Sequence, residues 1–363
     1  MRSLFLTKYT RRGPSSRYRV YQFLDFYRQA GIEPTVAPLF DDDYLDYVYT
    51  SRSAPKSKLT AAFLKRLTFL LRSRSWDLVH VQCELFPHVP GLFETLFSIW
   101  NPRYVVEYDD AVFETYKTKW WVRGKIPALM KKARAVIVGN EYIESFATQF
   151  SKRVHFVPTC VDLNKYEVKN HEVQNEGGIT VGWIGTPYTA KRYLLAFREH
   201  LKAMLDAAGV SFEFIGAPDG LDIGVPYRAV EWSEASEAEL LKRVDVGIMP
   251  ITDDAFSRGK SGLKLIQYMA CGLPVVASPV GENRNLVATG ENGYLADAPD
   301  EWARGIRSLA ADPSLRHRLG MNGRRTVEAS YSVSVHAPRL VNILYEAAGQ
   351  TPSKTDFTSG PEE

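Results

Sequence analysis

The 363-residue sequence predicts an α/β protein with two doubly wound domains that face a central cleft. Short apolar runs alternate with longer segments of helical periodicity, which is typical of parallel sheets with crossover helices. This alternation occurs twice, once on each side of a polar segment, 167–178, that ends in Gly-Gly. The length also suits two domains of roughly 150 residues each.

The first domain is predicted over residues 1–166. Helical periodicity within it is clearest over Arg17–Ala30 and Leu59–Arg72. Its six strand candidates are short apolar runs bounded by polar or turn residues. They are Leu4–Thr7, Thr35–Pro38, Asp77–Gln82, Tyr104–Tyr108, Ala135–Val138 and Val154–Val157.

The second domain is predicted over residues 179–335, after a linker over 167–178. A C-terminal helix is expected over 336–349, and the polar tail 350–363 has the composition of a disordered segment. The strand candidates are Ile179–Ile184, Ser211–Ile215, Tyr227–Val230, Val246–Pro250, Pro274–Ala277 and Gly293–Leu295, and the helix candidates are Tyr193–Ala208, Glu237–Val244, Gly262–Ala270 and Glu301–Ala311.

Composition excludes several classes of protein. Hydrophobic residues make up 45% and charged residues 24%, as in ordinary globular domains, and the net charge of +3 does not favour nucleic acid as a partner. Cys83, Cys160 and Cys271 cannot all pair and match no zinc spacing, which favours a reducing, cytoplasmic location. No apolar run reaches the roughly 20 residues of a membrane span, so any membrane contact would be peripheral.

The segment Phe256–Pro279 has the densest chemistry. Gly259 and Gly262 flank Lys260-Ser261 where a helical pattern begins. Backbone N–H groups and the helix dipole at such a terminus favour an anion. Arg258 and Lys260 add cations, and Ser261 would act as the cap or as an extra donor. We therefore predict a diphosphate site formed by Arg258, Lys260, Ser261 and Gly262.

Two polar side chains lie further along the same helical pattern. Lys264 and Gln267 share a face, and their neighbours are mostly apolar. Long polar side chains on a buried helix need partners, which a ribose and a diphosphate would supply. Alternatively, Lys264 reaches solvent, and the two cations of the loop are simply hydrated.

These residues resemble glycosyltransferase family 4, the retaining enzymes with the GT-B fold. Met269–Val276 reads MACGLPVV, which fits the strand leader of that family, and the match extends from Val244–Pro250 to Asn292-Gly293. The Arg-Gly-Lys loop resembles a subset of the family. The resemblance implies transfer of a sugar, expected to be a hexose, from a nucleotide-diphosphate sugar to a hydroxyl of a glycan, glycolipid or small molecule.

The resemblance also implies how such an enzyme works. Reaction occurs on one face of the donor, and the leaving phosphate assists deprotonation of the acceptor. No cofactor and no metal are expected, since cations and a helix terminus would neutralise the diphosphate. Biosynthesis of the cell envelope or of polysaccharides is the expected setting.

The sequence departs from the family pattern at three positions. The two motif glutamates fall on Gly259 and Gln267, and the arginine after the first strand of the second domain is Thr186. A Gln267 carbonyl would still accept hydrogen bonds from ribose hydroxyls. Lys191 is retained as a diphosphate ligand, and Arg258 is expected to supply the missing charge.

Polar side chains in the first domain are candidates for the acceptor side. Gly13 would allow close approach to the donor phosphate, and Arg17 would meet an anionic group, unless the segment is a plain strand–helix turn. Further candidates follow predicted strands, with helix capping or solvation as the alternative. Asp109 and Asp110 would orient the acceptor, take its proton or stabilise positive charge, and Glu84 and His88 lie one strand away.

Two basic segments contain apolar residues in helical spacing. Lys56–Arg74 has six cations and no acid, and the second, Thr115–Arg134, also contains Trp120 and Trp121. Both suit the anionic inner face of a membrane. A buried face beside an ordinary solvated one, or a surface for an anionic acceptor, would give the same pattern.

Other functions remain open. A Rossmann oxidoreductase lacks support because no G-x-G-x-x-G follows the first strand. A sugar-nucleotide epimerase fits the fold class but not the segment Phe256–Gly293. A catalytically inactive binding or scaffold protein is consistent with the missing carboxylates at Gly259 and Gln267.

Overall fold

The computed structural model describes residues 1–50, 53–170 and 178–351. The chain forms two compact units. Unit 1 comprises Met1–Val48, Arg52–Thr159 and Val333–Glu363, and unit 2 comprises Tyr49–Ser51 and Cys160–Ser332.

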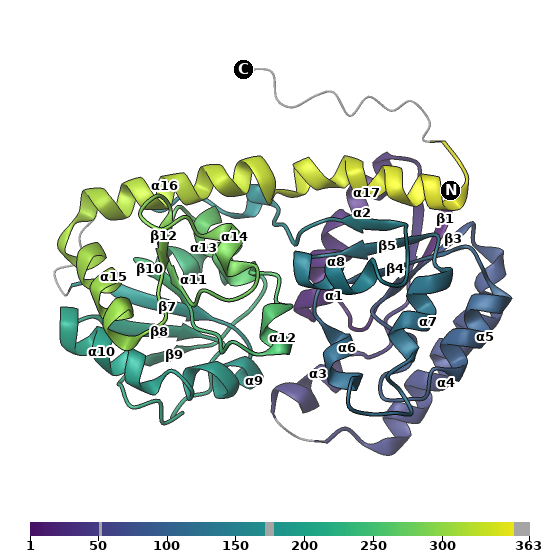
Figure 1. Ribbon diagram of the computed structural model, residues 1–363, viewed down its shortest axis with the longest axis horizontal. Helices are drawn as coiled ribbons and strands as arrows, with labels where there is room; N and C mark the ends of the chain where they lie inside the picture. Colours follow the sequence, from purple (N-terminus) through teal and green to yellow (C-terminus); the bar gives the residue numbers. More distant parts are fainter. Residues whose placement is uncertain (51–52, 171–177, 352–363) are drawn as a thin grey trace. The chain divides into compact units, whose positions relative to one another are not determined.

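Unit 1 contains a six-stranded parallel sheet in the order β2-β1-β3-β4-β5-β6 (Figure 1). The topological switch lies between β1 and β3, because the chain leaves β1 for one edge and then returns to build the other. The strands are β1 (Arg2–Leu6), β2 (Glu33–Val36), β3 (Leu78–Gln82), β4 (Tyr104–Tyr108), β5 (Ala135–Val138) and β6 (Val154–Phe156).

The helices of unit 1 are α1 (Pro14–Arg19), η1 (Tyr21–Phe23), α2 (Leu24–Gln29), α3 (Asp42–Tyr49), α4 (Lys56–Arg72), η2 (Ser73–Ser75), α5 (Leu92–Trp100), α6 (Val112–Tyr116), α7 (Lys125–Lys132), α8 (Glu141–Ala147) and α17 (Val333–Ala348). The single helix predicted over Arg17–Ala30 is wrong, since α1, η1 and α2 divide that segment. Val20 leaves the helical conformation (φ −127°) at the point where the preceding Arg19 ion-pairs with the buried Glu107 of β4.

Unit 2 contains a second six-stranded parallel sheet, in the order β12-β11-β10-β7-β8-β9, with its switch between β7 and β10 (Figure 1). Its strands are β7 (Thr180–Ile184), β8 (Ser211–Ile215), β9 (Arg228–Val230), β10 (Val246–Met249), β11 (Val275–Ala277) and β12 (Gly293–Leu295). Each of the twelve predicted strands overlaps one of these elements or one of the strands of unit 1.

The helices of unit 2 are η3 (Leu163–Lys165), α9 (Pro187–Thr189), the π-helical η4 (Ala190–Leu194), α10 (Arg198–Ala208), α11 (Glu237–Lys242), α12 (Ala255–Arg258), α13 (Leu263–Ala270), α14 (Asn283–Leu286), α15 (Pro299–Ala311) and α16 (Pro313–Ser330). The helix predicted over Tyr193–Ala208 therefore begins as a π-turn, and regular α-helix starts at Arg198.

The units divide at other positions than the predicted boundaries at 166 and 335. Tyr166 packs in unit 2, where its hydroxyl donates to Glu237 and its carbonyl accepts from Arg324. The last helix, α17, packs in unit 1 and buries Tyr345, whose hydroxyl donates to the carbonyl of Ala30 at 2.7 Å. Residues 171–177 of the predicted linker and 352–363 of the predicted tail lie outside the described residues.

Within the described ranges, no helix is both long enough and apolar enough to pass through a bilayer.

Candidate functional site

The switch point of unit 2 is built around Tyr268 of α13. Its hydroxyl accepts from the backbone N–H of Ile184 in β7 at 2.9 Å and donates to the carbonyl of Ile248 in β10 at 3.3 Å. The register between these strands is confined to their amino-terminal halves. Gly247 makes room for the ring, because a Cβ there would lie 2.2 Å from it. A side chain thus bridges the two central strands where open α/β sheets bind ligands.

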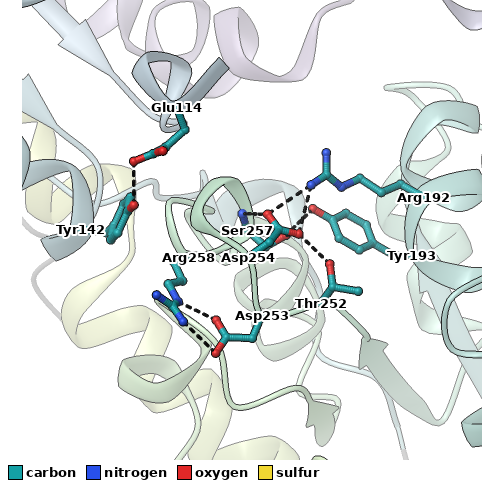
Figure 2. A network of polar contacts seen from close by, with 9 residues as sticks. All are labelled: Glu114, Tyr142, Arg192, Tyr193, Thr252, Asp253, Asp254, Ser257 and Arg258. Atoms are coloured by element: carbon teal, nitrogen blue, oxygen red, sulfur yellow. Dashed lines mark hydrogen bonds and ion pairs between the residues drawn. The ribbon is translucent and has the colours of Figure 1, made fainter. Parts of the chain in front are cut away.

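The loop after β10 is organised by Asp254 (Figure 2). One carboxylate oxygen caps α12 by accepting from the N–H of Ser257 at 2.9 Å, and the other accepts from the hydroxyls of Thr252 and Ser257 at 2.7 and 3.0 Å. Burial alone would raise the pKa of Asp254, but these hydrogen bonds and one from Arg192 lower it to about 2. The cap therefore stays ionised at neutral pH and fixes the start of α12.

Arg192 joins η4 to this loop. Its guanidinium donates to both carboxylate oxygens of Asp254, at 3.1 and 3.2 Å, and lies 5.1 Å from the ring centre of Phe256. Lys191, the predicted ligand, is exposed beside it. Arg192 was not among the predicted ligands, because the family spacing points to Lys191 instead. The π-turn at η4 also rotates the following side chains relative to an α-helix, which helical spacing does not anticipate.

Arg258 lies at the end of α12 and pairs with Asp253 (Figure 2). The contact is bidentate, with Nε at 2.6 Å from one carboxylate oxygen and a terminal nitrogen at 3.1 Å from the other. This hydrogen-bonded pair holds the pKa of Asp253 below its usual value. Gly281 packs against the same turn with φ +53°, and a Cβ there would lie 2.4 Å from the carbonyl oxygen of Arg258.

The start of α13 differs in one detail from its prediction. Gly262, not Ser261, is the N-cap residue, with φ +68° and no capping side chain, so the cap role predicted for Ser261 is wrong. A Cβ on Gly262 would lie 2.2 Å from a side-chain carbon of Leu286. Both the positive φ and this lack of space therefore require glycine at the position. Lys260 lies just before this terminus, with its ammonium 4.7 Å from the ring centre of Phe256.

Lys264 and Gln267 occupy the first two turns of α13. The ammonium of Lys264 lies 5.3 Å from the ring centre of Trp183 in β7. Gln267 is buried, and its amide nitrogen donates to the hydroxyl of Tyr166 at 3.4 Å, which in turn donates to Glu237 at 2.8 Å. These two hydrogen bonds orient the Gln267 side chain, because its amide nitrogen is used as the donor to Tyr166. The carbonyl oxygen of Gln267 is the group that can accept a hydrogen bond.

In unit 1, the candidates that follow β1 are engaged within the protein. A Cβ on Gly13 would lie 2.4 Å from Cβ of Tyr9, so this glycine allows Tyr9 to pack. Arg17 is buried, with its guanidinium 4.9 Å from the ring centre of Tyr18 and one nitrogen 3.5 Å from the carbonyl of Arg12. Gly13 is the N-cap residue of α1 and Arg17 lies within that helix. This arrangement is that of a plain strand–helix turn, the alternative given for the segment.

Asp109, directly after β4, is buried and sits 3.8 Å from the thiol of Cys83. Burial and the neighbouring Asp110 raise its pKa to about 6. Cys83 (φ 62°) and His88 (φ 61°) are the non-glycine residues of the described chain with positive φ, and both lie in the loop after β3. Strain of this kind is found at functional sites.

Glu84 belongs to a buried ionic cluster that no sequence motif predicts. Its carboxylate accepts from the hydroxyl of Tyr116 at 2.9 Å and lies 2.8 Å from the ammonium of Lys125. Lys125 also contacts Glu94 at 3.2 Å and is fully buried. Within the basic segment Thr115–Arg134, Lys125 therefore belongs to a buried face, which was one of the alternatives for this segment.

In the other basic segment, Lys56–Arg74, Arg66 is also buried. Its side chain donates to the carbonyl of Thr7 at 2.6 Å, and burial lowers its pKa to about 9. Among residues 1–50, 53–170 and 178–351, no three His, Cys, Asp or Glu side chains are grouped as a metal ion would require.

The structure thus gathers five of the predicted residues into one stretch of unit 2, between α12 and the first turn of α13. These are Arg258, Lys260, Ser261, Gly262 and Lys264. Gln267 lies one turn further, Lys191 lies next to the Arg192–Asp254 pair, and Gly13 lies in unit 1.

Part of unit 2 matches a known family of proteins. Residues 179–312 match the family model described as "Glycosyl transferases group 1". A lipopolysaccharide core biosynthesis mannosyltransferase of Rhizobium leguminosarum bv. viciae is 29% identical over 161 residues, covering 44% of this chain and 40% of that protein. A D-inositol 3-phosphate glycosyltransferase of Thermomonospora curvata is 36% identical over 126 residues, covering 32% and 28%. The chain thus matches less than half the length of these curated relatives.

Solved structures resemble the chain over nearly its whole length. Anabaena Alr3699/HepE, in complex with UDP and glucose, has a TM-score of 0.72 at 16% identity and covers 95% of this chain and 100% of that one. Sucrose-phosphate synthase from Thermosynechococcus elongatus has a TM-score of 0.71 at 16% identity, covering 95% and 98%. The chain therefore has the GT-B fold, built from two Rossmann-like units, and its unit 2 is similar over residues 179–312 to the group 1 glycosyl transferases.

Proposed function

We propose that the protein is a retaining glycosyltransferase that transfers a hexose from a nucleotide-diphosphate sugar to a hydroxyl of a glycan, glycolipid or small-molecule acceptor. The supporting observation is the amino terminus of α13. Its N-cap residue is Gly262, so no side chain caps its backbone N–H groups. It follows the cations Arg258 and Lys260. The helix itself bridges β7 and β10 through Tyr268.

The chemistry of this terminus suits a leaving diphosphate. Helix dipole and backbone N–H groups favour an anion, and Arg258 and Lys260 add positive charge at the same end. As the bond from the anomeric carbon to the diphosphate breaks, charge develops on the phosphate oxygens that these groups would meet. The bond to the acceptor oxygen forms on the same face, and the acceptor proton passes to the leaving phosphate.

Other residues have supporting roles in the proposal. The carbonyl oxygen of Gln267, oriented by Tyr166, would accept from a ribose hydroxyl. Lys191 and Lys264 would contact the diphosphate or nucleotide. On the acceptor side, Asp109 and Asp110 would orient the hydroxyl or stabilise positive charge on the sugar. A site of this kind needs no metal cofactor.

The proteins that this chain resembles favour the same substrate classes. One structural neighbour was solved with UDP and glucose, and one sequence relative is a mannosyltransferase of lipopolysaccharide core biosynthesis. These names support a nucleotide sugar as donor and an acceptor in cell-envelope or polysaccharide biosynthesis.

Thermal shift with UDP-, GDP- and ADP-sugars tests the donor site, since a bound ligand stabilises the folded state by mass action. We expect one nucleotide class to raise the melting temperature, and Arg258→Ala and Lys260→Ala to reduce that rise. Arg304→Ala is the matched control, because Arg304 forms a similarly exposed ion pair with Asp300 on α15. Equal shifts in all three variants would mean that the donor binds elsewhere.

Nucleotide release in the presence of glycan and glycolipid acceptors tests the reaction itself. Turnover is expected with the nucleotide class that gives the thermal shift. Binding without turnover across the acceptor panel would instead favour an inactive binding protein, for which Gly259 and Gln267 at the motif positions are the supporting observation.

A further inference from the structure

Helix α5 of unit 1 presents an apolar face to solvent. Its spacing i, i+1, i+4, i+7, i+8 places five large side chains on one side of the helix. Their exposed fractions are 62% for Leu92, 39% for Phe93, 53% for Leu96, 62% for Ile99 and 45% for Trp100. Contiguous exposure of this kind marks an interaction surface, whereas single exposed apolar residues are ordinary.

The opposite side of α5 already serves the core. Phe97 is buried with its ring centre 5.3 Å from that of Tyr104, and Glu94 is buried against Lys125. Helix α5 also packs along α7 (Figure 1). The exposed face is therefore additional to the face that the fold of unit 1 uses.

Aromatic contacts link helix α4, which also has exposed apolar residues, to α5. The ring of Phe86 contacts Phe63 of α4 and Phe93 of α5, at 5.1 Å between ring centres in each case. Two further exposed side chains, Leu64 (60%) and Leu71 (63%), lie two turns apart on α4. We call the seven exposed apolar residues of α4 and α5 the α4–α5 surface.

Cations border the α4–α5 surface. Arg74 stacks on Trp100, with its guanidinium carbon 4.2 Å from the ring centre, and donates to the carbonyl of that residue at 2.7 Å. Lys65 and Arg72 are exposed next to Leu64 and Leu71. Segments 56–74 and 92–103 contain one acid, Glu94, and it is buried. The outward side of both helices is thus apolar and positive, without exposed carboxylates.

Two exposed tryptophans precede helix α7, which packs along α5. Trp120 and Trp121 belong to the turn that leads into α7. The first residue of that helix abuts Gly91 at the cap of α5, because a Cβ on Gly91 would lie 3.0 Å from Cα of Lys125. Tryptophan is favoured at the boundary between headgroups and acyl chains.

We propose that the α4–α5 surface docks on a lipid bilayer that contains anionic headgroups. The apolar side chains of α5 enter the boundary between headgroups and acyl chains, while Lys65, Arg72 and Arg74 meet the anionic headgroups. An anionic bilayer satisfies both the apolar and the positive character of the surface, whereas a second copy of the same positive surface would repel it. The proposal concerns unit 1 and is independent of the proposed donor site in unit 2.

Vesicle flotation with the full chain tests the proposal. One set of vesicles is pure phosphatidylcholine, and the other contains about one third phosphatidylglycerol. We expect binding to the anionic vesicles to be at least tenfold stronger, and the double variant Leu96→Ser, Ile99→Ser to lose at least tenfold of it. Arg72→Gln with Lys65→Gln should weaken anionic binding by a similar factor. Leu195→Ser, which removes an exposed apolar residue of unit 2, should bind as the unmodified chain does.

Three results would overturn the proposal. The first is negligible binding to both kinds of vesicle. The second is binding that the α5 double variant leaves unchanged. The third is concentration-dependent self-association in sedimentation that the double variant abolishes, which would assign the surface to a second copy of the chain. Circular dichroism and the nucleotide-induced thermal shift, which reports on unit 2, identify variants that fail to fold.

Discussion

The two units share one sheet design, but their ionic pairs differ in exposure. In unit 1, the charges next to β3 and β4 are buried and paired, as in the contact of Lys125 with Glu84 and that of Arg19 with Glu107. In unit 2, the pairs Arg258–Asp253 and Arg192–Asp254 involve carboxylates of the loop after β10, and both partners of each pair are partly exposed. Similar topologies thus place ionic groups in different environments.

The difference indicates what each set of charges can do. When one ion of a buried pair is removed, the other is left as an uncompensated charge in a low dielectric. Buried pairs therefore fix the local structure. An exposed pair is worth little to stability and can exchange its partner for an incoming anion. We therefore expect changes in unit 1 to act on folding, and changes in the loop of unit 2 to act on ligand binding.

The largest expected effect is that of Lys125→Met. Removing this ammonium leaves Glu84 and Glu94 buried without their common cation, so the free energy of unfolding should fall by about 3–5 kcal/mol. Urea unfolding of the variant, with Arg304→Ala as an exposed control, measures the change. A loss under about 1 kcal/mol in Lys125→Met would contradict the structural role that we assign to the cluster.

Asp109→Asn is expected to have the next largest effect. The pKa of Asp109 rises to about 6 in the folded chain, so the ionised carboxylate weakens folding above that pH, by about 3 kcal/mol at most. The variant should therefore be more stable than the unmodified protein at pH 8, and the difference should shrink as the pH falls from 6 towards 4. Thermal unfolding across this range measures it.

The same substitution also tests catalysis. If the ionised Asp109 acts on the acceptor, the rate of transfer should fall below pH 6 in the unmodified protein, and Asp109→Asn should be slower by roughly 10²-fold without that acid limb. An acid limb that persists in the variant would assign the titration to another group.

Tyr268→Phe should have an intermediate effect. The change removes the hydroxyl that bridges Ile184 and Ile248, and the buried N–H of Ile184 then lacks this acceptor, at a cost of about 1–3 kcal/mol. Tyr294→Phe, at a half-buried tyrosine of β12 in the same unit, is the control. We also expect a smaller nucleotide-induced thermal shift. If the two variants behave alike, the bridge does not shape the site.

Asp253→Asn should change stability least. The exposed pair with Arg258 contributes at most about 1 kcal/mol, but releasing Arg258 from its carboxylate should strengthen nucleotide binding several-fold. Titration calorimetry at low and high salt measures this gain, which salt should reduce because it screens exposed charges. The matched control is Asp300→Asn on α15. A weaker affinity in Asp253→Asn would show that the carboxylate itself helps to hold the ligand.

Much of the fold could be predicted from the sequence because its signals are local. Strand candidates in unit 2 such as Val246–Pro250 are short apolar runs between turn residues, and β10 is found at that position. The loop 258–262 could also be predicted as the start of a helix, since glycines and cations cluster there. Its predicted role in binding a diphosphate remains a proposal.

Interruptions of helices and partners of charges could not be predicted in the same way. The π-turn at η4 and the break at Val20 lie where side chains pair across the fold, Arg192 with Asp254 and Arg19 with Glu107. Helical periodicity reports which residues share a face, but it does not report what lies opposite that face.

The sequence by itself determined the two parallel sheets, the order of their strands along the chain and the glycine-marked start of α13, because backbone propensity and periodicity act between near neighbours. The tertiary structure alone decided that Lys125 and Arg66 are buried, that Arg258 faces Asp253 and that α5 keeps an apolar face exposed. The physical reason is that the environment of a side chain depends on contacts between residues far apart in sequence. Local propensity and composition do not specify which of these residues come into contact.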